Sequence, residues 1–140
     1  MSAIDVVMTL TNALNAQQWE AAASSLTDDF TATGLAPITL SKQMLIAGEQ
    51  AWHASSPDRR ARLDQVREED GVVKATLTVE GTQTNVLSLQ NIPPVPASGK
   101  HYSASGNMTA TVRGGQVASL QVVGTTPGQL EQLGIQLPQA

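Results

Sequence analysis

The sequence predicts an α+β fold in which N-terminal helices pack on one face of an antiparallel sheet. Up to residue 54, apolar side chains recur at helical spacing behind residues that favour helix starts. From Ala61 onward, apolar and polar residues alternate, as they do in half-buried strands. Helices first and strands afterwards is the order typical of α+β domains. With 140 residues, the chain is expected to form one domain over residues 1–140.

Three helices are expected in the first part of the chain. Ser2 and Asp5 form the pattern of an N-terminal cap, and the helix that they begin should end near Asn15. A second helix is expected from Trp19 to Leu26, ended by Thr27-Asp28-Asp29 and followed by a short strand over 30–33. Ser41 should cap a third helix from Lys42 to about Ala54, which Ser55-Ser56-Pro57 would end.

The rest of the chain predicts strands joined by tight turns. A strand begins at 61 and ends at the turn 69–71, and a second continues through 73–79 with Val, Ala, Leu and Val on one face. Gly81 suggests a bend or bulge, and 82–89 keeps strand character. The Pro-rich run 91–99 lacks amide donors and is expected to be a loop. Strands over 103–112 and 117–123 flank a Gly-Gly turn, and a short helix follows.

Composition and charge exclude several classes of function. The formal net charge is −4, and no cluster of Lys or Arg forms a basic stripe, so nucleic acid is not an expected partner. Arg59, Arg60 and Arg62 lie close together but alternate with Asp58 and Asp64, which predicts a solvated turn. The chain has no cysteine, so a disulfide, a thiolate zinc site and a thiol nucleophile are excluded.

The apolar segments are short. No window approaches the ~20 apolar residues that span a bilayer, so no membrane partner is expected. The N-terminus lacks the basic start and apolar run of a signal peptide, which predicts a cytoplasmic protein. No His, Asp and Glu residues share metal-ligand spacing, and Asp28-Asp29 is better explained as a helix end. We therefore predict neither a metal site nor a cofactor.

Four segments, taken in order, resemble one known family. They are NAQQWEAAASSLTDDF (15–30), NIPPVPASG (91–99), HYSASGNMTATVRGGQVASLQVV (101–123) and PGQLEQLG (127–134). Their order and spacing resemble the SnoaL-like polyketide cyclases of the nuclear-transport-factor-2-like superfamily. The resemblance implies a cone-shaped, curved antiparallel sheet wrapped around the N-terminal helices, a cavity between them, and a homodimer formed through the outer sheet face.

In this family an aspartate often acts as acid and base on the strand before the Gly-Gly turn. The matching position here is Met108, whose thioether cannot transfer a proton. A one-residue slip would place Asn107 there, and an amide could orient a carbonyl without acting as a base. The closing strand has Ser119-Leu120-Gln121 where the family often has Glu-His-Trp. The base of the related ketosteroid isomerases is also missing, because TATG follows Phe30.

Three residues remain as candidates for catalysis. Alternation places Tyr102 in the inward row of Met108, where its hydroxyl could polarise a carbonyl or simply pack at the rim. His53 could act as a base at the cavity mouth, or be a surface histidine at a helix end. Gln121 would be a buried amide in need of a partner if its face is concave. Because each has a structural alternative, the catalytic residues stay unknown at this point.

The expected ligand is a small hydrophobic molecule, since apolar walls with a few polar groups are typical of small-molecule pockets. The residues expected to contact it are Trp19, Phe30, Met44, Trp52, Tyr102, Met108 and Gln121. Two functions follow: a SnoaL-like enzyme acting on a polyketide-like substrate, or a non-catalytic binding protein for an apolar ligand. A third interpretation, a dimerisation module with a filled interior, predicts no cavity of useful volume.

Overall fold

The computed structural model describes residues 1–90 and 92–135, and its elements follow the predicted helices-then-strands order. The four helices are α1 (Ala3–Asn15), α2 (Trp19–Ser24), α3 (Lys42–Ser55) and α4 (Gln129–Gln132). The strands are β1 (Leu26–Thr33), β2 (Leu40–Ser41), β3 (Arg60–Glu69), β4 (Val72–Thr82), β5 (His101–Arg113) and β6 (Gln116–Gly124).

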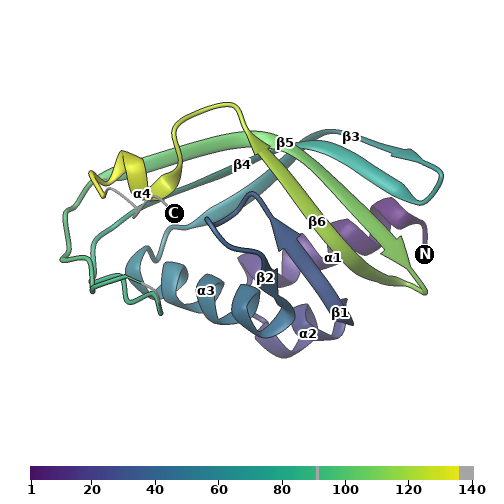
Figure 1. Ribbon diagram of the computed structural model, residues 1–140, viewed down its shortest axis with the longest axis horizontal. Coiled ribbons are helices and arrows are strands. Elements are labelled where there is room, and N and C mark those ends of the chain that lie inside the picture. The colour runs from purple at the N-terminus through teal and green to yellow at the C-terminus, as the bar shows by residue number, and fades with distance from the viewer. Residues whose placement is uncertain (91, 136–140) are drawn as a thin grey trace.

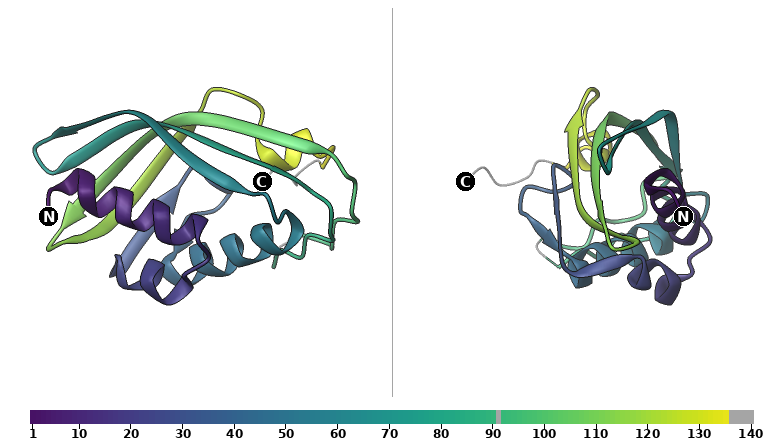
Figure 2. Two further views of the ribbon diagram at one scale, coloured as in Figure 1. Left: turned by 180° about the vertical axis from the view of Figure 1, so that it is seen from behind. Right: turned by 90° about the vertical axis from the view of Figure 1, so that its right-hand side faces the viewer.

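The six strands form one sheet in the order β2-β1-β6-β5-β4-β3, and the sheet curves around the N-terminal helices (Figure 1). Figure 2 shows α1 lying along the inner side of the sheet, with α2 and α3 beneath it. All neighbouring strands are antiparallel except β1 and β6, which run parallel. The sheet is therefore antiparallel, as expected from the sequence, except at this pair. The long intervening chain supplies the crossover that parallel strands require.

The predicted helix caps are present. The Asp5 amide donates to the Ser2 hydroxyl at 3.1 Å, and the Ser2 amide donates to the Asp5 carboxylate at 3.2 Å. The Met44 amide donates to the hydroxyl of Ser41 at the start of α3. At the end of α1, the Asn15 side chain exchanges two hydrogen bonds with the backbone of Ala61, at 2.8 and 2.9 Å. These bonds fix α1 against the edge strand β3.

The second helix is shorter than predicted, and Asp28-Asp29 does not form a helix end. Helix α2 stops at Ser24, and Leu26 already pairs with β6 in the sheet. Burial of Leu26 and Phe30 in the main core favours strand over helix here. Both aspartates are exposed on β1, where Asp29 pairs with Arg113 at 2.5 Å. Tertiary burial therefore overrides the turn preference of the aspartates.

The β5 strand carries the inward row that alternation predicts. Tyr102, Gly106, Met108 and Ala110 are buried, whereas their neighbours in the other row are exposed or half-buried. On β6 the alternation breaks, because Thr111 pairs with Ser119 but Val112 pairs with Val117. One extra residue on β6 therefore forms a bulge, and inward-facing positions shift by one beyond it.

The segment after β4 is a loop rather than the strand expected over 82–89. Strand β4 ends at Thr82, and the only described pairing beyond it in this loop is an isolated bridge between Leu87 and Val95. The fully buried Gln83 side chain donates to the carbonyls of Val95 and Pro96, each at 3.1 Å. The Gln83 side chain therefore holds the Pro-rich loop together with the two backbone hydrogen bonds between Leu87 and Val95.

Gly81 lies in regular pairing with Tyr102, so the expected bend or bulge at this glycine is wrong. A Cβ atom at this position would lie 2.6 Å from the Tyr102 hydroxyl oxygen and 3.2 Å from the Arg59 Cα. The glycine is therefore required by the close approach of a side chain, and not by strand curvature. Among the described residues, no helix is long and apolar enough to cross a membrane.

Candidate functional site

A cavity of about 1130 Å³ lies between the helices and the inner face of the sheet. Its wall comes from α1, α3, α4, β2, β3, β4, β5, β6 and loop residues at 34–38, 88–90 and 92. Most of the lining residues are apolar; those on the sheet side include Leu63, Leu77, Val79, Met108 and Leu120. This volume contradicts the interpretation of the protein as a dimerisation module with a filled interior.

Three ionisable side chains, Glu49, His53 and Arg59, gather on the helical side of the cavity. Arg59 follows α3 directly, and its side chain is only 3% exposed. Its Nε donates to Oε2 of Glu49 at 3.2 Å and its Nη2 donates to Oε1 at 3.1 Å, which makes a two-point ion pair. Its Nη1 donates to the Tyr102 hydroxyl at 3.2 Å and to the side-chain oxygen of Gln129. We call Glu49, His53, Arg59 and Tyr102 the Arg59 cluster.

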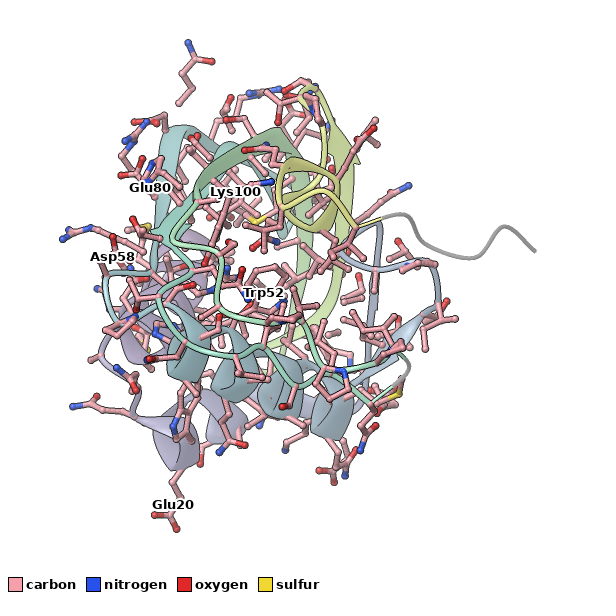
Figure 3. The ribbon with its side chains drawn as sticks, turned by 90° about the vertical axis from the view of Figure 1, so that its left-hand side faces the viewer. Glu20, Trp52, Asp58, Glu80 and Lys100 are labelled. Atoms are coloured by element: carbon pink, nitrogen blue, oxygen red, sulfur yellow. The ribbon has the colours of Figure 1, made fainter. Side chains whose placement is uncertain are left out.

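Aromatic rings enclose the guanidinium. Its carbon lies 4.9 Å from the ring centre of Trp52 and 5.9 Å from that of Tyr102, within the range of cation–π attraction. The two rings pack edge to face, with their centres 5.2 Å apart. Figure 3 shows Trp52 in the interior, while Asp58 and Glu80 lie at the margin of the molecule.

Arg59 remains charged despite its burial. Desolvation acts to lower its pKa, but the charge of Glu49 and the hydrogen bonds to Glu49 and Tyr102 act in the opposite direction. The net effect is a raised pKa for Arg59. The solvated turn predicted for this arginine is therefore wrong. Glu49 explains why this arginine can be buried, because it lies one turn before Trp52 on α3 and provides a carboxylate beside the guanidinium.

His53 lies on the same helix, one turn after Glu49, and is 5% exposed. Its Nε2 is 3.9 Å from Oε2 of Glu49, and its ring packs edge to face with Trp19, with the ring centres 5.4 Å apart. Burial lowers the pKa of His53; the Glu49 charge opposes this effect and the Arg59 charge adds to it. The imidazole is therefore neutral at neutral pH. Its buried Nδ1 has no hydrogen-bond partner among the described residues.

The sequence-predicted site residues divide into four groups, the last of which is Gln121 alone. Met44, Trp52, Met108 and the candidate base His53 line the cavity. Tyr102 is fully buried behind Arg59, where its hydroxyl accepts from the guanidinium instead of facing the cavity mouth. The residues Trp19 and Phe30 pack outside the cavity lining, Trp19 against His53 and Phe30 in the main core.

Gln121 is exposed, so its expected place in a concave wall is wrong. The bulge on β6 is the physical reason, because it turns Leu120 inward and Gln121 outward. Leu120 takes the place on the cavity wall that alternation assigned to Gln121.

Sequence reasoning missed Glu49 and Arg59, the two charged members of the cluster. The sequence contains one signal for them. Leu45, Glu49 and Trp52 are spaced by four and three residues, so the carboxylate lies within the apolar stripe of α3. A carboxylate on an inward face requires a nearby cation, and the arginines at 59–62 are the nearest in sequence after the helix.

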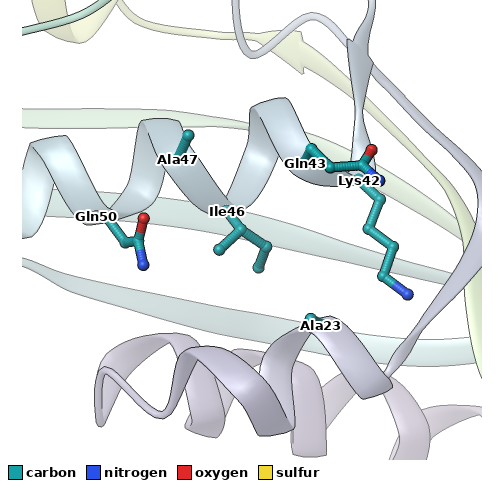
Figure 4. Close-up of a pocket in the computed structure, with 6 residues that line it drawn as sticks. All are labelled: Ala23, Lys42, Gln43, Ile46, Ala47 and Gln50. Atoms are coloured by element: carbon teal, nitrogen blue, oxygen red, sulfur yellow. The ribbon is translucent and has the colours of Figure 1, made fainter.

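A second, smaller hollow of about 260 Å³ lies between α2 and α3. Figure 4 shows Ile46 pointing from α3 toward Ala23, with Lys42 at one end of the hollow. Lys42 already donates to the Leu26 carbonyl at 3.2 Å. This hollow contains none of the Arg59 cluster, so the large cavity is the candidate site.

A protein-family model described as a SnoaL-like domain matches residues 7–120, which is most of the chain. The chain belongs to the SnoaL-like domain family. The match includes α1 from Val7 onward, the Arg59 cluster and the β5–β6 hairpin as far as Leu120. A comparison with curated proteins gives no match.

Solved structures share the fold of this SnoaL-like domain at low sequence identity. IdmH from Streptomyces antibioticus, proposed to be a polyketide cyclase, has a TM-score of 0.74 and 18% identity, covering 96% of this chain and 100% of its own. AclR from Streptomyces galilaeus, proposed to be a hydroxylase, has a TM-score of 0.73 and 15% identity, covering 94% and 95%.

A SnoaL-like polyketide cyclase from Agrobacterium tumefaciens has a TM-score of 0.71 and 15% identity, covering 96% of this chain and 99% of its own. The family model confirms the predicted SnoaL-like family, and these likenesses confirm its curved-sheet fold. Because the names of such similar structures include both cyclase and hydroxylase, the shared fold does not specify a reaction.

Proposed function

We propose that this SnoaL-like domain binds a small, largely apolar molecule of the polyketide-like class in its cavity. The observation that carries the proposal is the cavity of about 1130 Å³, with apolar residues over most of its wall and a polar cluster on one side. Drug-sized ligands bind in pockets of roughly 300–1,000 Å³ with this distribution of polarity.

Gly48 offers a direct test of the cavity. It lies on α3, lines the cavity, and a Cβ added there would meet nothing within 4 Å. We expect Gly48→Phe to fill part of the cavity and to weaken binding of a naphthalene-type probe at least about tenfold. Gly48→Ala is the matched control, because it removes the same helical glycine and leaves the space open.

The measurement is calorimetric titration of methyl 2-naphthoate into the wild type and both variants. Mass spectrometry of molecules that co-purify with each form would then identify the natural ligand. If the wild type and Gly48→Phe bind the probe equally, the cavity is not the binding site.

A second function, acid–base catalysis on the bound molecule, is favoured by His53. A neutral imidazole beside a carboxylate in an apolar site has the properties of a general base. The imidazole would take a proton from the carbon next to a ketone, leaving an enolate, and would then return it. Since Met108 occupies the family's usual acid position, His53 would take over proton transfer in this chain.

Deuterium exchange tests catalysis without knowledge of the substrate. We expect the wild type to speed exchange of the methyl protons of 2-acetonaphthone in D₂O, followed by proton NMR, and His53→Gln to abolish the acceleration. The exposed His101 provides the control variant His101→Gln. If the ketone binds but its methyl protons exchange at the background rate, the protein is a non-catalytic binding protein.

The homodimer remains a proposal. The outer face of the sheet carries Asn107, Gln121 and Val123, and Val123 is 59% exposed. Sedimentation at micromolar concentration should show a dimer that Val123→Lys weakens, and a monomeric wild type would contradict it.

We propose a cytoplasmic setting without nucleic-acid or membrane partners, in keeping with the net charge of −4.

A further inference from the structure

The charges on the cavity wall limit the ligands that the cavity can accept. Among the described lining residues, Glu49 and Glu131 are carboxylates and Arg59 is the one permanent cation. Arg59 is already neutralised by Glu49 at 3.1 Å. The wall therefore offers no cation free of a counter-ion in the described part of the chain.

The donors of Arg59 are also nearly exhausted. A guanidinium has five N–H groups. Two donate to Glu49, one to Tyr102 and one to Gln129, which leaves a single N–H on Nη2. Arginine frequently binds a carboxylate through two parallel N–H groups, which is its strongest arrangement. That fork is already occupied by Glu49.

His53 does not add a positive charge. Burial favours its neutral form, and its Nε2 lies 3.9 Å from the Glu49 carboxylate. The Glu49 side chain is 20% exposed and lines the cavity together with Arg59. The cluster thus presents one N–H donor and carboxylate acceptors side by side, an arrangement that suits a hydroxyl group, which both donates and accepts.

We infer that the Arg59–Glu49 ion pair makes the cavity selective for an uncharged ligand, an apolar molecule bearing a hydroxyl, ketone or ester group, against the corresponding carboxylate. This inference rests on the proposed binding function and specifies the ligand's chemical class. An anion that displaced Glu49 from Arg59 would leave two carboxylates close together without a second cation, an arrangement that strongly disfavours ionisation of both.

The test compares ligands of one shape and different charge. Methyl 2-naphthoate, 2-naphthol and 2-naphthoate are titrated calorimetrically into the wild type at pH 7.5. We expect the ester and the naphthol to bind at least about tenfold more tightly than the carboxylate, because a buried charge without a partner is strongly unfavourable. Equal or tighter binding of 2-naphthoate would overturn the inference while leaving the binding function intact. Failure of all three to bind would overturn both.

Glu49→Gln links the selectivity to the ion pair. The variant keeps the size of the side chain and leaves Arg59 without a counter-ion, so the preference for the ester over the carboxylate should shrink at least about tenfold. Asp64→Asn removes an exposed carboxylate outside the cavity lining and should change the preference less than about twofold. If a folded Glu49→Gln protein keeps the wild-type preference, the ion pair is not its cause. Should Glu49→Gln fail to fold, the wild-type comparison alone decides.

Discussion

The two walls of the cavity differ in chemistry. On the sheet wall, Leu77, Met108 and Leu120 present only apolar surface, although the family often has an acid at the position of Met108. On the helical wall, Glu49, His53 and Arg59 form a charged and titratable cluster. The difference teaches that the cavity has ionisable side chains although none occupies the position of the family acid. The ionisable groups lie on α3 and the turn after it.

The largest expected effect comes from breaking the ion pair of the helical wall. Glu49→Gln leaves the Arg59 guanidinium buried without a counter-ion, and should destabilise the fold by about 3–5 kcal/mol. Urea denaturation measures the loss. The control is Asp64→Asn, which breaks the Arg62–Asp64 pair at 2.9 Å with both side chains more than half exposed. That change should lower stability by less than about 1 kcal/mol. Equal losses of stability in Glu49→Gln and Asp64→Asn would contradict the expected difference between a buried and an exposed ion pair.

The next prediction puts a charge on the apolar wall. Met108 is 5% exposed, so Met108→Asp should destabilise the protein by about 3 kcal/mol at neutral pH, whereas Met108→Leu should have little effect. Burial raises the pKa of a carboxyl group, so the folded variant would bind a proton more tightly than the unfolded chain. Its stability should therefore be greatest in acid and fall as the pH rises through the raised pKa. Denaturation midpoints that parallel those of the wild type from acid to neutral pH would show that residue 108 does not face the cavity.

A smaller loss of stability is expected at Gly81, where β4 lies against Tyr102 of the Arg59 cluster. Gly81→Ala would place a methyl group 2.6 Å from the Tyr102 hydroxyl oxygen and 2.9 Å from its ring carbon Cζ, and so displace the ring from Arg59. We expect a loss of about 1–3 kcal/mol by thermal or chemical denaturation. Gly48→Ala, which meets nothing within 4 Å, should instead stabilise its helix by up to about 1 kcal/mol. A Gly81→Ala protein as stable as the wild type would mean that Tyr102 adapts freely.

The smallest effect concerns His53 and appears only in acid. The pKa of His53 is lowered in the folded state, so the unfolded chain binds more protons as the pH falls below about 6.5. Wild-type stability should decrease over this range, and His53→Gln should reduce the decrease. The groups that surround the imidazole are Glu49, Arg59 and the edge of Trp19. His101→Gln, which changes an exposed histidine, serves as the control; an identical pH dependence in the wild type and His53→Gln would contradict the prediction.

Sequence periodicity located the sheet wall better than the helical wall. Regular alternation on β5 predicted the inward position of Met108, because a strand places every second side chain on the same face. The same rule failed at Gln121, since a bulge adds one residue and no pattern in the sequence marks it. Arg59 was missed because alternating charges over 58–64 resemble a solvated turn. Its burial depends on Tyr102 and Gln129, contacts that are remote in sequence.

The spacing of the Arg59 contacts along the chain has a consequence for folding. Arg59 is ten residues from Glu49 but 43 from Tyr102 and 70 from Gln129. Closing a short loop loses less entropy than closing a long one, so the pairing with Glu49 can form before the sheet brings Tyr102 into place. The guanidinium would then enter the interior with its charge already neutralised, and the barrier to folding would not include the burial of a lone cation.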